Sequence, residues 1–324
     1  MLGTDYPEDT LPDDDESILA SVTPHLRQAD VTFGNLEGVL LDGGEPAKEC
    51  SKPDSCYLFR TPTRYARYLR EAGFDVISLA NNHARDFGEE GRDRSMQVLS
   101  AQGIRHSGRV GDIASWRVKG LRVALVAFAP FVDSNDMLDI PKAMELVATL
   151  SRRHEIVMVS IHAGAEGLDI LHIPFATEYY HGENRGDVVK FAHAVIDAGA
   201  DLVFGHGPHV PRAMELYKDR LIAYSLGNFS THWGINVKDL RGLAPILVAR
   251  VDGLGRFQQG QIISARQQRP AGPSIDQSHE AARLMQQLTL QDFPHTPLEI
   301  SPNGRIERKL RQTPAVADKR RQGL

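Results

Sequence analysis

The sequence contains no long apolar run. Its apolar segments all fall short of the roughly 20 consecutive residues that a membrane-spanning helix needs. The first nine residues are acidic and lack the basic and then apolar pattern of a signal peptide. As written, the chain is therefore expected to be cytoplasmic. A missing upstream segment would leave a membrane-associated or extracytoplasmic location open.

Cysteine is scarce, since Cys50 and Cys56 are the only two in 324 residues. Their turn-rich spacer, Ser-Lys-Pro-Asp-Ser, could close a small disulfide loop, whereas both thiols would stay free in a reducing compartment. The pair alone is a weak signal for zinc. The net charge of −5 gives no overall basic face, so we expect no nucleic-acid partner.

What the sequence does contain is an alternation of apolar and helical segments. The apolar segments predict strands over residues 31–34, 74–79, 123–128, 156–161, 201–204 and 221–224. Helical periodicity lies between several of them, over residues 63–72, 142–153 and 187–198. This order is typical of βαβ units and predicts an α/β fold with a largely parallel sheet.

The pattern changes in the last third of the chain. Residues 246–251 and 257–265 predict two antiparallel strands, because the Asp-Gly-Leu-Gly sequence between them is a hairpin signal. A helix is predicted over residues 276–291. Residues 305–311 and 319–321 are locally basic, and we interpret them as a solvated tail.

Polar side chains follow five of the predicted strands. They occupy residues 35–38, 80–86, 162–166, 205–209 and 225–229. Ligands of open α/β sheets bind outside the carboxyl ends of the strands, so these stretches can converge in one crevice. Carboxylate, amide and imidazole groups together suit zinc, manganese or iron. The sequence therefore predicts one metal site at the strand ends.

Each polar residue also has a simpler explanation when it is taken alone. Glu37 could be a turn residue, and Asn82 and Asp86 could satisfy turn backbone as Asx motifs. His162 could be a hydrogen-bonded core histidine. The pair in Gly-His-Gly-Pro-His, residues 205–209, is harder to explain structurally, and five such clusters together favour the convergent site.

The five motifs resemble the CapA family. They are Asn-Leu-Glu-Gly (35–38), Ala-Asn-Asn-His (80–83) with Asp86, Ser-Ile-His (160–162) with Glu166, Gly-His-Gly-Pro-His (205–209) and Tyr-Ser-Leu-Gly-Asn-Phe (224–229). This is the poly-gamma-glutamate capsule biosynthesis family of the calcineurin-like metallophosphoesterase superfamily. The resemblance covers residues 1–265, and residues 266–324 are left as a C-terminal helix and basic tail. It implies a four-layer α-β-β-α sandwich of the metallophosphoesterase type.

The resemblance also implies roles for individual residues. The metal ligands would be Glu37, Asn82, His162, His206 and His209, holding one or two divalent ions (Mn, Zn or Fe). His83 would act at the leaving group, with Asp86 orienting it by a hydrogen bond, while Asn81 ties the turn. We assign substrate binding to Arg60, Arg85 and Asn228, with a surface or structural role as the alternative for the two arginines.

Two features depart from the family pattern. The family begins with a strand ending in Gly-Asp, whose Asp ligates metal, and this sequence starts just after that point. We therefore expect the first strand and its ligand to be missing here. The histidines His206 and His209 also stand one residue further apart than in the wider superfamily's phosphoesterases, so phosphatase activity does not follow automatically.

The chemistry expected from this set is metal-assisted hydrolysis of an anionic polymer or a phosphoester. The scissile bond would be a phosphoester or a gamma-glutamyl amide, and other capsule synthesis proteins are expected partners. One alternative is a non-catalytic assembly or polymer-binding factor with a structural metal. A second alternative is a metal-dependent peptide epimerase.

Overall fold

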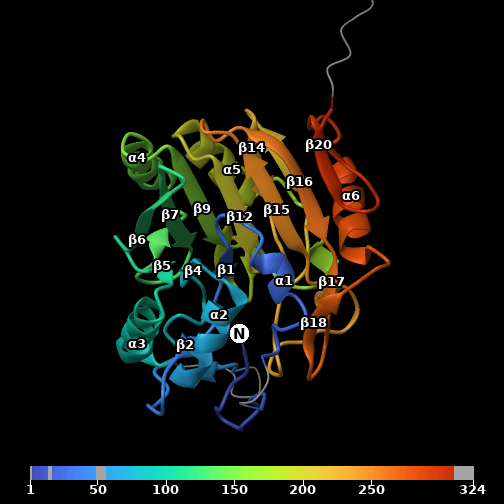
Figure 1. Ribbon diagram of the computed structural model, residues 1–324. Coiled ribbons are helices and arrows are strands. Elements are labelled where there is room, and N and C mark those ends of the chain that lie inside the picture. Colours follow the sequence, from blue (N-terminus) through green and yellow to red (C-terminus); the bar gives the residue numbers. More distant parts are fainter. Residues whose placement is uncertain (1, 14–16, 49–55, 310–324) are drawn as a thin grey trace, which may run out of the picture.

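The structure, a computed structural model, describes residues 2–13, 17–48 and 56–309. Its strands form a seven-stranded, a four-stranded and a three-stranded sheet and several two-stranded pairs, with helices on their outer faces (Figure 1). The predicted α/β class is therefore confirmed. The order of the four layers in a sandwich stays a prediction, because the strands that should form its second sheet belong to separate sheets.

The seven-stranded sheet forms the centre of the fold. Its order is β13-β14-β12-β9-β7-β6, with β8 paired to β7. The bounds are β6 Ile113–Val118, β7 Leu121–Ala129, β8 Asn135–Asp136, β9 Ile156–His162, β12 Leu202–His206, β13 Met214–Tyr217 and β14 Arg220–Ala223. Every residue of β9 is buried, as expected for a parallel strand covered on both faces. The predicted strands at 123–128, 156–161, 201–204 and 221–224 all lie in this sheet.

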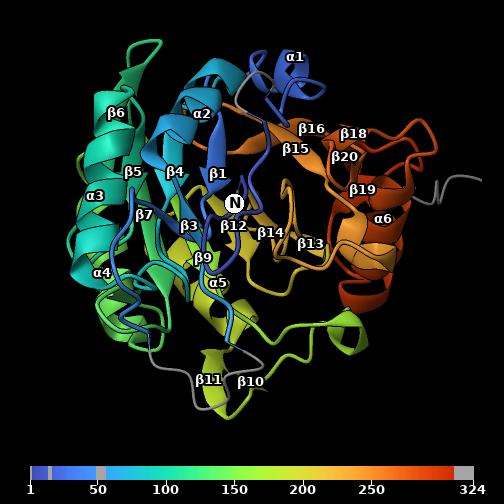
Figure 2. The ribbon, with the colours of Figure 1, turned by 90° about the horizontal axis from the view of Figure 1, so that it is seen from below.

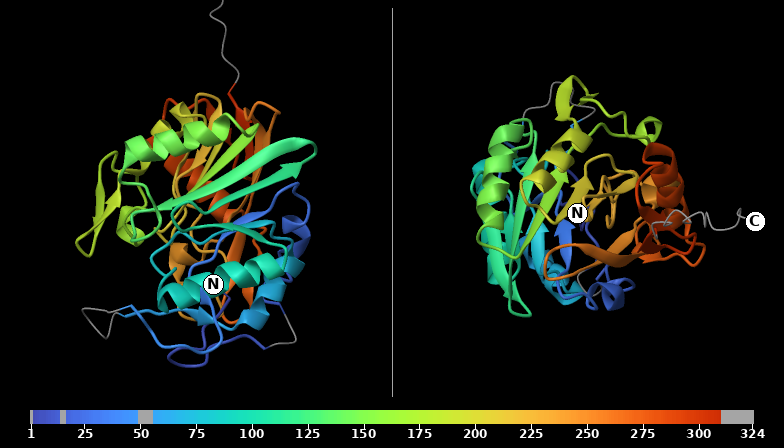
Figure 3. Two further views of the ribbon diagram at one scale, coloured as in Figure 1. Left: turned by 90° about the vertical axis from the view of Figure 1, so that its left-hand side faces the viewer. Right: turned by 90° about the horizontal axis from the view of Figure 1, so that it is seen from above.

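Two helices cover the outer face of this sheet (Figure 3). They are α4 (Ile140–Ser151) and α5 (Val188–Asp197), and each begins at an aspartate whose side chain accepts a hydrogen bond from the first turn. Val147 and Phe191 on these helices share one apolar core with Val126 and Val159 of the sheet. The hairpin of β10 (Glu178–Tyr180) and β11 (Glu183–Gly186) lies just before α5 in the chain.

The N-terminal part forms a small parallel sheet of order β1-β4-β5. The strands are β1 (Phe33–Asn35), β4 (Val76–Ser78) and β5 (Arg105–Ser107), and a short pair joins β2 (Val39–Leu40) to β3 (Arg60–Thr61). The helices here are α1 (Thr23–Leu26), α2 (Ala66–Ala72, after a 3-10 turn at Thr63–Tyr65) and α3 (Gly88–Ala101). Helix α3 was not predicted, because its buried face includes Arg92 and Ser95 rather than an apolar stripe.

The last third forms a four-stranded sheet of order β15-β16-β20-β19. Its elements are β15 (Ile246–Val251), β16 (Phe257–Ile263), β19 (Leu298–Ile300) and β20 (Arg305–Arg308), with the pair β17 (Ala265–Gln268) and β18 (Gly272–Ile275) and helix α6 (Glu280–Asp292) beside it. The predicted hairpin of β15 and β16 is confirmed. The tail prediction is wrong for residues 305–308, because they pair as β20 with β16 and β19.

Several predictions fall partly or wholly on residues that the structure does not describe. Residues 310–324, the rest of the basic tail, lie outside the described ranges. Cys56 takes part in a disulfide, but Cys50 lies outside the described residues. Across the described ranges, none of the helices combines the length and apolar character needed to cross a bilayer.

Candidate metal centre

Two neighbouring parallel strands deliver two histidines to the same edge of the central sheet. His162 ends β9 and His206 ends β12, and the two residues are direct register partners. Side chains of register partners point to the same face of a sheet, so the two imidazoles start from adjacent positions. His162 is almost fully buried at 1% exposure.

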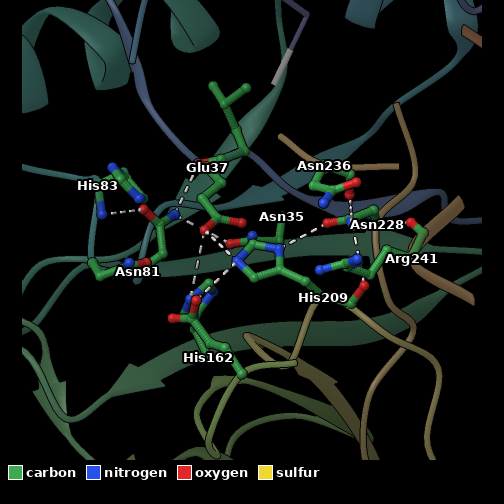
Figure 4. Close-up of polar contacts among 12 residues, drawn as sticks. Asn35, Glu37, Asn81, His83, His162, His209, Asn228, Asn236 and Arg241 are labelled. Atoms are coloured by element: carbon green, nitrogen blue, oxygen red, sulfur yellow. Dashed lines mark hydrogen bonds and ion pairs between the residues drawn. The ribbon is translucent and has the colours of Figure 1, made fainter. Parts of the chain in front are cut away.

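The carboxylate of Glu37 faces this edge from the N-terminal sheet. Glu37 follows β1, and its Oε1 atom lies 3.9 Å from His162 Nε2 and 3.6 Å from His209 Nε2. Figure 4 shows the carboxylate pointing toward both imidazoles. The cluster is thus built across two sheets, from residues more than a hundred positions apart in the chain.

A hydrogen bond to Asn228 fixes the orientation and the tautomer of the His209 ring. The Nδ1 atom lies 2.7 Å from Asn228 Oδ1, and the amide nitrogen of Asn228 donates to the carbonyls of His209 and Arg241 at 3.2 and 3.1 Å. Because the Asn228 oxygen can only accept, Nδ1 carries the hydrogen. The lone pair of the neutral ring is then on Nε2, the atom that faces Glu37.

Burial and mutual charge set the protonation of the cluster. Burial alone would raise the pKa of Glu37, but the histidines around it, His209 above all, lower it to about 2. Burial lowers the pKa of His162 to about 3 and that of His206 to about 4, against the attraction of Glu37. Both imidazoles are therefore neutral at pH 7, the form that binds metals.

The pKa of His209 moves in the opposite direction. Burial lowers it, but the nearby carboxylates of Glu37 and Glu166 and the hydrogen bond to Asn228 raise it overall. The negative charges of Glu37 and Glu166 thus favour the protonated form of His209. A bound divalent ion would replace that proton, so metal binding and protonation of His209 compete.

Several buried polar atoms in this cluster have no hydrogen-bond partner. They include Glu37 Oε1, Asn82 Oδ1, His162 Nε2 and His206 Nε2. Buried polar atoms are normally satisfied, so a converging set of orphaned oxygen and nitrogen donors fits a metal ion. All four belong to residues predicted as ligands.

The donor atoms are nevertheless not at the spacing needed to coordinate one ion. Within the described ranges, no three His, Cys, Asp or Glu side chains already form a metal-holding group. Donors that share one ion at about 2.1 Å lie about 3 to 3.5 Å apart. The contacts of 3.6 and 3.9 Å at Glu37 are slightly longer. Side-chain shifts below about 1 Å would bring these donors to ligand spacing.

In the Asn-Asn-His turn, Asn81 and His83 have different hydrogen-bond partners. The side chain of Asn81 donates to the carbonyl of Leu36 at 2.8 Å and accepts from the backbone of His83 at 3.1 Å, which confirms that it ties the turn. His83 Nδ1 lies 2.8 Å from Asp86 Oδ2, the orienting contact we expected. Since the carboxylate accepts, the other ring nitrogen of His83 is left for a second partner.

The predicted substrate-binding residues all have partners of their own. Arg60 pairs with Asp5 at 2.6 Å and donates to Gly44 at 2.8 Å, and Arg85 pairs with Glu89 at 2.8 Å and with Asp133 at 2.9 Å. These contacts match the structural alternative for both arginines. Asn228 holds His209 and two backbone carbonyls, which favours a positioning role. Substrate binding by the three residues stays a prediction.

The structure adds one acidic residue to the cluster. Glu166 Oε2 lies 3.6 Å from His209 Nε2, and its other oxygen accepts from Arg185 at 3.1 Å. Glu166 lies in a quoted motif, but its position four residues after His162 gave no reason to prefer it over a loop carboxylate. Arg185 comes from β11, and nothing in its sequence context signals this contact.

The comparisons with known proteins agree on one family. The model of the family described as "Bacterial capsule synthesis protein PGA_cap" matches residues 1–232. The chain is 28% identical over 239 residues to "Capsule biosynthesis protein CapA" of Bacillus anthracis, which covers 70% of this chain and 54% of the relative. It is 27% identical over 231 residues to "PGA biosynthesis protein CapA" of Bacillus subtilis (strain 168), with 66% and 56% covered.

A mycobacterial protein has a similar sequence identity to this chain. A "Probable polyglutamine synthesis accessory protein" of Mycobacterium tuberculosis is 29% identical over 228 residues, covering 61% of this chain and 55% of the relative. The chain therefore spans only a little over half the length of these curated relatives. The family match covers well over half of the chain, so the protein belongs to the PGA_cap family of bacterial capsule synthesis proteins.

Proposed function

We propose that this protein is a metal-dependent hydrolase that acts on an anionic polymer of capsule or polyglutamate synthesis. The observation that supports this most strongly is the set of orphaned buried donors at the ends of β9, β12 and the loops beside them. Buried polar residues with a purely structural role would have formed hydrogen bonds with one another. Glu37 Oε1 instead lies 3.9 Å from His162 Nε2 and 3.6 Å from His209 Nε2 without a hydrogen bond to either ring.

The metal would be held by Glu37, Asn82, His162, His206 and His209, with Glu166 within reach of His209. A divalent ion bound there would polarise an oxygen of the substrate or of water and so favour hydrolysis. Asn228 keeps Nε2 of His209 directed at the site, and Arg185 holds Glu166 in place. Zinc, manganese and iron all suit this donor set.

His83 would protonate the leaving group. Asp86 holds its Nδ1 atom, and the ring packs against Phe59 with 4.4 Å between ring centroids. Asp86 is itself fixed by the backbone N–H of Phe59 at 2.8 Å and by Lys48 at 3.4 Å. A histidine oriented in this way can donate a proton from its remaining nitrogen to the leaving group.

The substrate follows from the family rather than from the cluster. The relatives are named for capsule, PGA and polyglutamine synthesis, which favours a gamma-glutamyl amide over a phosphoester. The wider spacing of His206 and His209 also makes an inherited phosphatase less attractive.

The test compares two substrate classes with one variant pair. Metal-loaded protein should cleave poly-gamma-glutamate or a gamma-glutamyl anilide faster than p-nitrophenyl phosphate. His83→Ala should lower turnover by roughly 10²- to 10⁴-fold while the metal content stays unchanged. His295→Ala, at an exposed histidine outside the cluster, is the control. Full activity of His83→Ala would remove the general acid from the proposal.

The alternatives predict different results in the same experiment. A polymer-binding assembly factor would bind poly-gamma-glutamate with metal present but release no product from any substrate. A peptide epimerase would change the stereochemistry of a terminal residue without shortening the polymer. Chiral analysis of the products therefore separates the three functions.

A further inference from the structure

The side chain of Arg241, close to the candidate metal centre, is a cation without a partner. Within the described residues, its guanidinium forms no ion pair and no hydrogen bond, and its Nε atom is buried in that unpaired state. The residue as a whole is partly exposed. A guanidinium stays charged at any physiological pH and carries five N–H donors. All five are therefore available to a ligand.

Arg241 differs in this respect from the arginines of the neighbouring segments. Four arginines in the segments that carry the cluster each pair with a carboxylate. The pairs are Arg60 with Asp5, Arg85 with Glu89, Arg185 with Glu166 and Arg212 with Glu178. A charge that is partly removed from water costs free energy unless an opposite charge or a hydrogen bond compensates it. The described chain supplies no such compensation to Arg241, so we look for its partner in a ligand.

One amide group fixes the backbone of Arg241 next to that of His209. The side-chain nitrogen of Asn228 donates to the carbonyls of His209 and Arg241 at 3.2 and 3.1 Å. The oxygen of the same amide lies 2.7 Å from His209 Nδ1. Figure 4 shows Arg241 next to Asn228, in the same close-up as His209. The residue that orients one imidazole of the cluster therefore also places the unpaired arginine.

The turn that carries Arg241 is also held from the C-terminal part of the chain. Arg241 lies in the 3-10 turn Asp239–Gly242. Arg266 of β17 donates to the carbonyl of Asp239 at 3.3 Å and pairs with Glu280 of α6. Figure 2 shows β18, the partner of β17, on the same side of the molecule as α6. A side chain on a fixed backbone loses less freedom on binding, which favours a specific contact.

A carboxylate is the ligand that suits this cation. The planar guanidinium can meet it with two parallel N–H···O bonds, which are stronger than neutral hydrogen bonds. A gamma-linked glutamate chain uses its side-chain carboxyl groups in the amide bonds, so each residue keeps a free α-carboxylate. We propose that Arg241 binds such an α-carboxylate when a gamma-glutamyl bond lies at the metal centre, and so selects this polymer. The identity of the polymer rests on the proposed function, whereas the unpaired cation beside Asn228 does not.

The test measures binding in EDTA, without metal or turnover. The ligands are a gamma-linked glutamate pentamer and its neutral match, in which every α-carboxylate is a carboxamide. Arg241→Gln should weaken binding of the carboxylate pentamer by about 10- to 100-fold, because charge-assisted hydrogen bonds are lost. Both proteins should bind the carboxamide equally weakly. The control is Arg153→Gln, at an exposed arginine after α4 whose side chain has no ion-pair partner in the described ranges, and it should change neither affinity.

Each other outcome of this titration overturns the proposal. An equal loss for both pentamers would mean that Arg241 only shapes its loop. An equal loss in Arg153→Gln would mean general attraction between charges. Absence of binding to the native chain would remove the site altogether. Tripolyphosphate is the competing anion, and tighter binding of it than of the glutamate pentamer, lost in Arg241→Gln, would assign the arginine to a phosphate.

A second measurement uses the native chain and stays decisive if Arg241→Gln does not fold. Phenylglyoxal modifies accessible guanidinium groups, and mass spectrometry locates the adducts. The glutamate pentamer at about ten times its Kd should slow modification of Arg241 by about tenfold, because only the free site reacts. Arg153 should react at an unchanged rate, and the carboxamide pentamer should protect neither residue. Protection of both arginines or of neither would contradict the proposal. Hydrolysis is not measured, so a chain without turnover would refute the hydrolase and leave this site intact.

Discussion

At the scale of single residues, the sharpest case is Asn228, which contacts His209 and not the centre of the cluster. Asn228→Ala removes the acceptor of Nδ1–H, so the ring can turn or change tautomer. We expect metal affinity to fall by about 10- to 100-fold, as for other residues behind a metal ligand. Calorimetric titration with Zn²⁺ or Mn²⁺ measures this. Asn303→Ala, on an exposed turn, is the control, and equal affinity in both variants would contradict the positioning role.

Some residues of the candidate site could be predicted from their residue types alone. The histidines at the ends of two apolar segments were recognisable, because imidazole is a rare way to end a buried strand. Asn81 and Asp86 were recognisable from their spacing to His83. Glu166 and Arg185 were missed as site residues. Glu166 lies in the loop after β9 and Arg185 lies on β11, and only the folded chain brings the two side chains together. Asn228 was placed at the site, but the contact that gives its task spans 19 positions.

At the scale of elements, a buried ion pair joins β10 to the segments that follow β9 and β12, from which His162 and His206 come. Arg212 is completely buried and binds both oxygens of Glu178 on β10, at 2.9 and 2.8 Å, and Glu178 also accepts from the backbone of Ala165. Arg212→Met should lower the free energy of unfolding by about 3 to 5 kcal/mol, because it leaves Glu178 buried and unpaired. In urea denaturation, the double variant Arg212→Met/Glu178→Met should recover most of that loss. A double variant as unstable as the sum of both singles would contradict this account.

Asp201, just before β12, predicts a pH effect on the same sheet. Burial raises its pKa to about 6, even though the backbone N–H of Val157 and Arg220 stabilise the carboxylate. Between about pH 4 and pH 6 the folded chain holds a proton that the unfolded chain has released. The contribution of Asp201 to stability is thus largest below pH 4 and is lost as the pH rises to 6. Relative to Asp201→Asn, the native chain should lose up to roughly 3 kcal/mol across this window, and a pH-independent difference would contradict the raised pKa.

Elements were predictable where apolar periodicity was strong. Strands β7, β9, β12, β15 and β16 and helices α4, α5 and α6 were expected within a few residues of their observed bounds. Helix α3 was missed because Arg92 and Ser95 occupy its buried face, where Arg92 is held by Glu89 and Ser95 by the carbonyl of Gly91. Strand β20 was taken for a tail because its residues are charged, although Arg305 and Arg308 stay exposed while the strand pairs with β16 and β19.

At the scale of the whole molecule, the candidate site depends on contacts between sheets that local patterns cannot specify. Glu37 follows β1 of the N-terminal sheet, and His162 and His206 belong to the central one. The sequence predicted that the polar strand ends converge, and Glu37, His162 and His209 do so within 4 Å.

The central claim is that the cluster binds a divalent metal, and metal content tests it most directly. Purified chain dialysed against Zn²⁺ or Mn²⁺ should retain one or two ions per molecule. Metal at about 100 times its Kd should stabilise the fold by about 2.7 kcal/mol. His206→Ala should lose both the metal and the stabilisation, while His295→Ala should keep both. Retention of metal by His206→Ala, or no retention by the native chain, would contradict the account.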